Sequence, residues 1–215
     1  MRALLVFPVI SLLCVLLACG GAHASRTEEV LAWETGQTPG YPIAGFAGMK
    51  LAVRFYAPEW ANWVTEVHFY IENDLVTNPT NPELPTTEEF MVLVWTPTGD
   101  NPPLPDSVVG PGVSSGELYP EDEWLHVVLP EPVEISNQDA FPNGVFFVGM
   151  EWLHRLNPYI GEELFEPADY MSYRYNWLEW ELRDEGDTMI RAVVCDTLAT
   201  PVQEGTWARV KAQYQ

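Results

Sequence analysis

The stretch Phe141-Pro-Asn-Gly-Val-Phe-Phe-Val-Gly-Met-Glu-Trp152 decides the fold class of this chain. A turn signal at its start leads into residues 145–152, which are apolar at both odd and even positions up to Glu151. A strand with this pattern is covered on both faces, so we expect it near the centre of a packed sheet. Phe90–Trp95 has the same double-sided pattern and predicts a second central strand.

Further strand patterns lie on both sides of this stretch, separated by turns rich in Gly, Pro, Asn and Asp. The cleanest alternation covers Trp63–Glu72 and predicts a strand with one face in the core, with Thr65, Val67, Phe69 and Ile71 inward. In all, about ten strands are predicted, at residues 29–35, 44–57, 63–72, 89–96, 107–118, 123–129, 145–152, 158–165, 171–180 and 188–195. Because no helical period of any length interrupts them, we predict an all-β protein: an antiparallel two-sheet β-sandwich of jelly-roll-like order.

Residues 1–24 have the features of an export signal, with one early charge followed by an apolar run too short for a membrane span. Two processing sites are consistent with its end. Leu16-Leu17-Ala18-Cys19 resembles a bacterial lipobox, which would make Cys19 a lipidated N-terminus, whereas Ala22-His23-Ala24 matches ordinary signal peptidase cleavage after Ala24. The protein is therefore expected outside the cytoplasm, either anchored in the cell envelope by a lipid or freely secreted.

The remaining chain is long enough for one domain, which we place at residues 29–195. A C-terminal tail, residues 196–215, contains a possible short helix over Thr206–Tyr214. Cys195 is left without a disulfide partner, and its apolar strand predicts a small buried side chain and not a reactive thiol.

The formal net charge of −21 comes from 31 acidic against 10 basic side chains. This field would repel nucleic acid and anionic membrane surfaces, so a membrane is expected to be reached only through a lipid anchor. We expect no cofactor, with calcium as the alternative, because hard carboxylate oxygens in turns suit that ion. The carboxylates considered for it are Asp184, Asp187, Glu162 and Glu163.

The succession of strands is similar to a class of uncharacterised extracellular β-sandwich domains found in exported bacterial proteins. The segments that carry this resemblance are Trp63–Ile71, Val145–Trp152, Tyr159–Gly161, Ser172–Tyr175 and Gly186–Val194. The resemblance implies a fold and an extracytoplasmic location, and it implies no catalytic residue.

The sequence contains one pattern typical of serine hydrolases and two histidine–carboxylate pairs that could bind a metal. Gly112-Val-Ser114-Ser-Gly116 matches the G-x-S-x-G pattern of serine hydrolases, but no helix is predicted after it, and that chemistry needs a strand-to-helix turn. The pairs Glu66 with His68 and Glu151 with His154 could each share a face, but no histidine stands at metal-ligand spacing from them in the sequence.

Aromatic residues offer a binding function instead, because exposed rings stack on sugar rings or hold a protein partner. The candidate ligand-binding residues are Trp60, Trp124, Tyr173, Tyr175 and Trp177, with core packing as the competing interpretation of the Tyr173–Trp177 row. We therefore expect a non-catalytic binding or adhesion module for a glycan or a surface protein. The alternatives are a structural component of an envelope or extracellular assembly, and a hydrolase without an identifiable motif.

Overall fold

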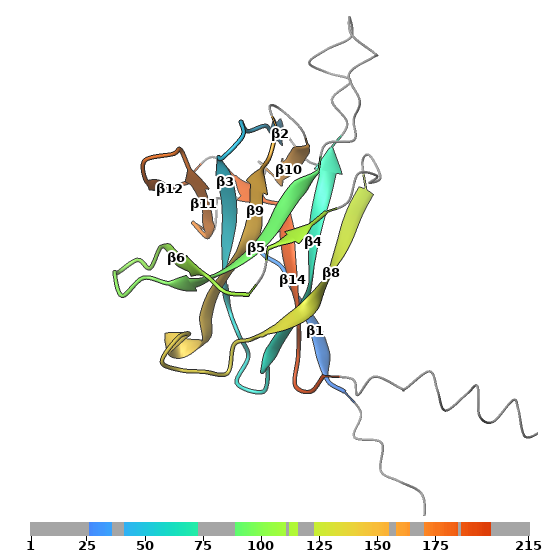
Figure 1. The fold of residues 1–215 in the computed structure, drawn as a ribbon, viewed down its shortest axis with the longest axis vertical. Helices are drawn as coiled ribbons and strands as arrows, with labels where there is room; N and C mark the ends of the chain where they lie inside the picture. The colour runs from blue at the N-terminus through green and yellow to red at the C-terminus, as the bar shows by residue number, and fades with distance from the viewer. Residues whose placement is uncertain are drawn as a thin grey trace, which may run out of the picture.

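The structure, a computed structural model, describes residues 26–35, 41–72, 89–110, 112–115, 123–154, 158–163, 170–184 and 186–198. Within these residues the chain forms two seven-stranded antiparallel sheets, which confirms the predicted all-β sandwich (Figure 1). Cys19 and the possible helix Thr206–Tyr214 lie outside the described residues. Among the described residues, no helix has the length and apolar character needed to cross a membrane.

Sheet A contains β1 (Glu28–Leu31), β2 (Tyr41–Ile43), β4 (Trp63–Glu72), β8 (Glu123–Glu134), β10 (Tyr159–Glu163), β13 (Asp187–Thr188) and β14 (Ile190–Cys195). Sheet B contains β3 (Lys50–Tyr56), β5 (Phe90–Pro97), β6 (Pro105–Val108), β7 (Val113–Ser114), β9 (Val145–Trp152), β11 (Ser172–Tyr175) and β12 (Trp180–Leu182). The chain crosses repeatedly from one sheet to the other, and β1 pairs with β14, so the order is jelly-roll-like.

Strand β9 lies in the middle of sheet B, between β3 and β5, as its double-sided apolar pattern predicts (Figure 1). Phe146, Val148 and Met150 face the main core between the two sheets. Phe147 and Val145 face the other way, into a smaller buried cluster on the outer side of sheet B, together with Leu93, Trp95, Ala52 and Tyr173. The outer side of sheet B therefore has a small apolar cluster of its own, and Arg54 lies over the ring of Tyr173 in it.

The structure places some strand boundaries differently from the sequence prediction. The single edge strand expected at residues 107–118 is two short strands, β6 and β7, which both pair with β5. The strand expected at residues 171–180 is a hairpin, with β11 and β12 joined by a turn that contains Trp177 in a left-handed backbone conformation, φ 73°. In both places, a turn divides the expected strand into two shorter strands.

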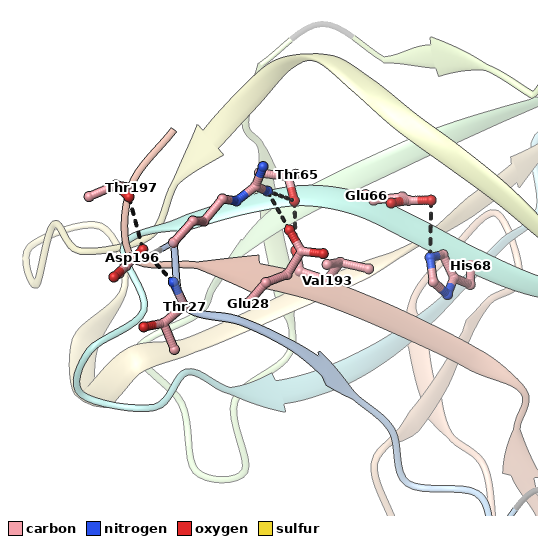
Figure 2. Close-up of polar contacts among 9 residues, drawn as sticks. Thr27, Glu28, Thr65, Glu66, His68, Val193, Asp196 and Thr197 are labelled. Carbon is pink, nitrogen blue, oxygen red and sulfur yellow. Dashed lines mark hydrogen bonds and ion pairs between the residues drawn. The ribbon is translucent and has the colours of Figure 1, made fainter. Parts of the chain in front are cut away.

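A β-bulge in β4 changes the predicted inward face of that strand. Val193 and Val194 of β14 are adjacent, but their partners on β4 are Glu66 and Val64, so Thr65 is the extra residue. Val64 enters the main core while Thr65 does not belong to it. The expectation that Thr65 points inward is therefore wrong, and its hydroxyl lies near the backbone oxygen of Val193 at 3.4 Å (Figure 2). A bulge adds one residue to one strand, which reverses the side-chain alternation on its two sides. Val67, Phe69 and Ile71 are in the core as predicted.

Cys195 is fully buried at the end of β14, which confirms the prediction of a buried side chain. Burial raises the pKa of its thiol above 9.0, against a smaller lowering effect of Arg26. Because the thiol of the unfolded chain ionises first, the unfolded state binds fewer protons above about pH 9 and the free energy of unfolding falls as pH rises.

We therefore expect the urea midpoint of the wild type to fall more steeply between pH 8.5 and about pH 10 than that of Cys195→Ala. We also expect a thiol reagent to label Cys195 only when the protein unfolds, since the thiolate is the reactive form. Equal pH slopes for the two proteins, or labelling of folded protein at the rate of a free thiol, would contradict this.

Candidate functional site

The outer side of sheet A brings together one carboxylate and two imidazoles from neighbouring strands. Glu66 and His68 are two residues apart on β4, after the bulge, and therefore lie on the same face. His126 on β8 is the direct cross-strand partner of His68. Their rings stack with centroids 3.8 Å apart and planes 24° apart. The antiparallel register thus joins residues that are far apart in the sequence.

One oxygen of Glu66 contacts both rings. Glu66 Oε1 lies 3.2 Å from His68 Nε2 and 3.2 Å from His126 Nδ1. Figure 2 shows the side chains of Glu66 and His68 facing each other along β4. The buried His68 Nε2 thus has Glu66 within ion-pair distance, and the geometry falls short of a full hydrogen bond.

The two histidines differ in their exposure to solvent. The side chain of His68 is 8% exposed and that of His126 is 55% exposed. Burial lowers the pKa of His68 below 6.5, and the neighbouring His126 adds to this effect, against an opposing contribution from Glu66. The His68 imidazole is therefore neutral over a wider pH range than a free histidine, and neutral imidazole is the form that binds metal ions.

Next to the histidines, Arg191 on β14 forms a link between three segments. Arg191 is the cross-strand neighbour of His68. Its guanidinium lies 3.7 Å from the ring centre of Trp124 on β8, and its Nε donates a hydrogen bond of 2.5 Å to Glu34. The Glu34 side chain is fully buried. Burial raises the pKa of Glu34 more than the nearby Arg191 lowers it. Trp124 therefore packs against a cation and, on another side, against Tyr70 at 5.6 Å.

A second feature is a groove of about 500 Å³ at the end of sheet B. It is lined by the buried Pro97 and Val145 and by Tyr56, which is 45% exposed. The other walls come from the loop between β5 and β6 and from the 3₁₀ turn Pro142–Gly144 before β9, which lie on the same side of the molecule (Figure 1). Polar side chains line these walls: Thr98, Asp100, Asn101 and Asn143.

The structure separates the five aromatic residues that the sequence singled out for ligand binding. Trp60 is partly buried against the main core, and Trp124 lies on the outer side of sheet A. Tyr173 is fully buried on the outer side of sheet B, and Tyr175 is half-buried beside Lys50 and Trp180. Trp177 is 52% exposed in its turn, 6.1 Å from Phe46. No shared surface includes all five, because they belong to opposite sheets and to different ends of the strands.

The carboxylates considered for calcium also occupy different surroundings. Glu162 faces Arg183, with Oε1 2.5 Å from Nη2, and both side chains are buried. Its neighbour Glu163 accepts a hydrogen bond of 2.6 Å from the Thr35 amide. Asp187 is buried opposite Glu163, whereas Asp184 is exposed. Among the described residues, only Glu66, His68 and His126 bring three ligand atoms within 4.8 Å of one another.

Of the sequence patterns, the pair Glu66 with His68 belongs to the cluster described above, whereas Ser114 with a histidine and Glu151 with His154 do not come together in the described part of the chain. Ser114 lies in the short edge strand β7 and hydrogen-bonds to Glu89, while His126 is in the other sheet. Glu151 forms an ion pair of 3.6 Å with Lys50, and His154 is exposed. The Ser114 hydroxyl therefore faces the Glu89 carboxylate and not the imidazole of His126, which is the type of base in a Ser-His-Asp triad.

Comparison with known proteins gave no match to a family model, to a curated protein or to a solved structure. The structure agrees with the resemblance to extracellular β-sandwich domains at the level of the fold, since the chain forms a two-sheet antiparallel all-β domain. No family is identified for it.

Proposed function

We propose that this protein is an exported, non-catalytic binding module that holds a neutral glycan in the groove beside Tyr56. The observation that carries the proposal is the composition of that groove: an exposed aromatic ring next to amide, carboxylate and hydroxyl side chains. A sugar has apolar C–H faces, which stack on an aromatic ring, and hydroxyl groups around its edge, which bond to such polar groups. The groove volume of about 500 Å³ also falls within the range of small-ligand sites.

Charge favours a neutral glycan over an acidic one. The chain has a formal net charge of −21, and Asp100 lines the groove itself. An anionic sugar would be repelled at long range and would lose favourable contacts at short range. Export is supported by the signal-like segment at residues 1–24.

The test is binding of the protein to an array of neutral and acidic oligosaccharides, followed by titration of any ligand found. We expect Tyr56→Ala to weaken binding about tenfold, because an aromatic stacking contact contributes roughly 1 kcal/mol or slightly more. Asn143 has φ 57°, a left-handed conformation that glycine also adopts. Asn143→Gly therefore removes the side-chain amide without straining the turn, and it should weaken binding as well.

The matched control is Tyr170→Ala, which removes an exposed tyrosine that does not line the groove. Circular dichroism would establish that all three variants are folded. An array without ligands, or glycan binding that is the same in Tyr56→Ala as in the wild type, would refute the proposal.

A further inference from the structure

The Glu66, His68 and His126 cluster has the composition of a transition-metal site. Two imidazoles and one carboxylate form a three-residue ligand set used for Zn²⁺, with a fourth position left for water or another ligand. All three side chains lie on the outer side of sheet A, and two of them lie on the same strand. Strand pairing on both sides of β4 holds their backbone positions, which gives the cluster a rigid base.

The distances between the ligand atoms fit a metal ion. Zinc binds nitrogen and oxygen ligands at about 2.0–2.1 Å, so two ligand atoms of a tetrahedral site lie roughly 3.3 Å apart. Glu66 Oε1 lies 3.2 Å from His68 Nε2 and 3.2 Å from His126 Nδ1. The atoms of all three residues lie within 4.8 Å of one another, and the two stacked imidazoles would have to rotate about their side-chain bonds to direct both nitrogens at one ion.

A buried nitrogen without a hydrogen bond gives independent support. His68 is more than nine-tenths buried, and its Nε2 lacks a hydrogen-bond partner although it faces the Glu66 carboxylate. Leaving a buried polar atom without a hydrogen bond is unfavourable, and a metal ion between the three ligands would satisfy it. The positive charge of Arg191 is paired with Glu34, which reduces its repulsion of a cation at this site.

We propose that Glu66 Oε1, His68 Nε2 and His126 Nδ1 bind one divalent transition-metal cation of the Zn²⁺ type. The exposed side of the site, at His126, leaves the fourth position open to water or to a donor group of a partner. This inference is independent of the glycan groove, because the two sites lie on different sheets.

The experiment is calorimetric titration of the untagged protein with Zn²⁺ after treatment with EDTA. We expect one Zn²⁺ per chain and a rise in Tm that EDTA reverses. The same protein with Co²⁺ should show the strong visible absorption of a tetrahedral site. His126→Gln should weaken Zn²⁺ binding at least about a hundredfold, and this exposed position keeps the variant foldable. Glu66→Gln should also weaken binding and reduce the Co²⁺ absorption.

His154→Ala provides the matched control, since His154 is exposed and lies outside the cluster. It should bind Zn²⁺ with wild-type affinity. No saturable binding of Zn²⁺ at millimolar concentration would overturn the proposal. So would wild-type affinity in His126→Gln, or a large loss of affinity in His154→Ala.

Discussion

Gly149→Ala is expected to lower the free energy of unfolding by about 3 kcal/mol or more, which is at the upper end for overpacking in a core. Gly149 lies in the middle of β9, where it pairs with Ala52 on β3 and Leu93 on β5. A β-carbon added at Gly149 would meet the backbone oxygen of Leu51 at 1.9 Å and the α-carbon of Ala52 at 2.8 Å. Because both obstacles are backbone atoms of the adjacent strand, β9 and β3 would have to separate. Urea denaturation followed by tryptophan fluorescence measures the loss.

Gly99→Ala is the control for this prediction. A β-carbon at Gly99 meets no atom within 4 Å, so this variant should be as stable as the wild type or slightly more stable. If Gly149→Ala had wild-type stability, the close approach of β9 to β3 would be refuted. If both variants were destabilised to the same extent, the cause would be the loss of glycine and not the contact with Leu51.

The two central strands were predictable because burial on both faces leaves a direct mark in the sequence. Phe90–Trp95 and Val145–Trp152 have apolar side chains at successive positions, and the structure places them next to each other in sheet B. The sequence predicted a jelly-roll-like sandwich in general, but it did not predict which strands are neighbours in each sheet. Which strands pair depends on contacts between segments far apart in the chain, and alternation within a single segment does not record them.

The Glu66, His68 and His126 cluster shows why such pairings cannot be predicted from one segment of the sequence. Glu66 and His68 form a pair that the sequence shows, but His126 joins them only through the register of β4 with β8. The usual sequence signatures of zinc sites depend on fixed spacing within one segment. A ligand that comes from a neighbouring strand has no such fixed spacing in the sequence. In addition, the register between β4 and β8 shifts between Val64 and Glu66, and this shift is not visible in the sequence.

The groove was missed for a related reason. Its ring, Tyr56, ends an ordinary strand, and its polar walls are turn residues such as Asn101 and Asn143 that are typical of any loop. The aromatic residues predicted for ligand binding included Tyr173 and Trp124. Tyr173 belongs to a buried cluster, and Trp124 packs against Arg191. A count of aromatic residues cannot separate rings that pack inside from rings that face solvent.

Arg183→Met is expected to lower the free energy of unfolding by about 3–5 kcal/mol, because it leaves the Glu162 carboxylate buried without its counter-ion. Arg183 follows β12 of sheet B and reaches Glu162 on β10 of sheet A, with Nε and Nη2 at 3.2 and 2.5 Å from Oε1. Both side chains are less than one-tenth exposed. The pair therefore joins the two sheets through a buried contact. Chemical denaturation of the variant and the wild type measures the difference.

The double variant Glu162→Met, Arg183→Met separates the cost of an unpaired charge from the value of the ion pair itself. Burying two charges is expensive, and an apolar pair of similar size often stabilises a protein as well as a buried ion pair does. We therefore expect the double variant to recover most of the stability that Arg183→Met loses.

Arg174→Met is the matched control, since Arg174 forms an ion pair with Glu181 at 3.2 Å in which both side chains are more than two-fifths exposed. An exposed pair of this kind contributes at most about 1 kcal/mol, so its loss should be small. Equal losses in Arg183→Met and Arg174→Met would show that Glu162 is not buried as the structure places it, and the link between the sheets at β10 would have to be reconsidered.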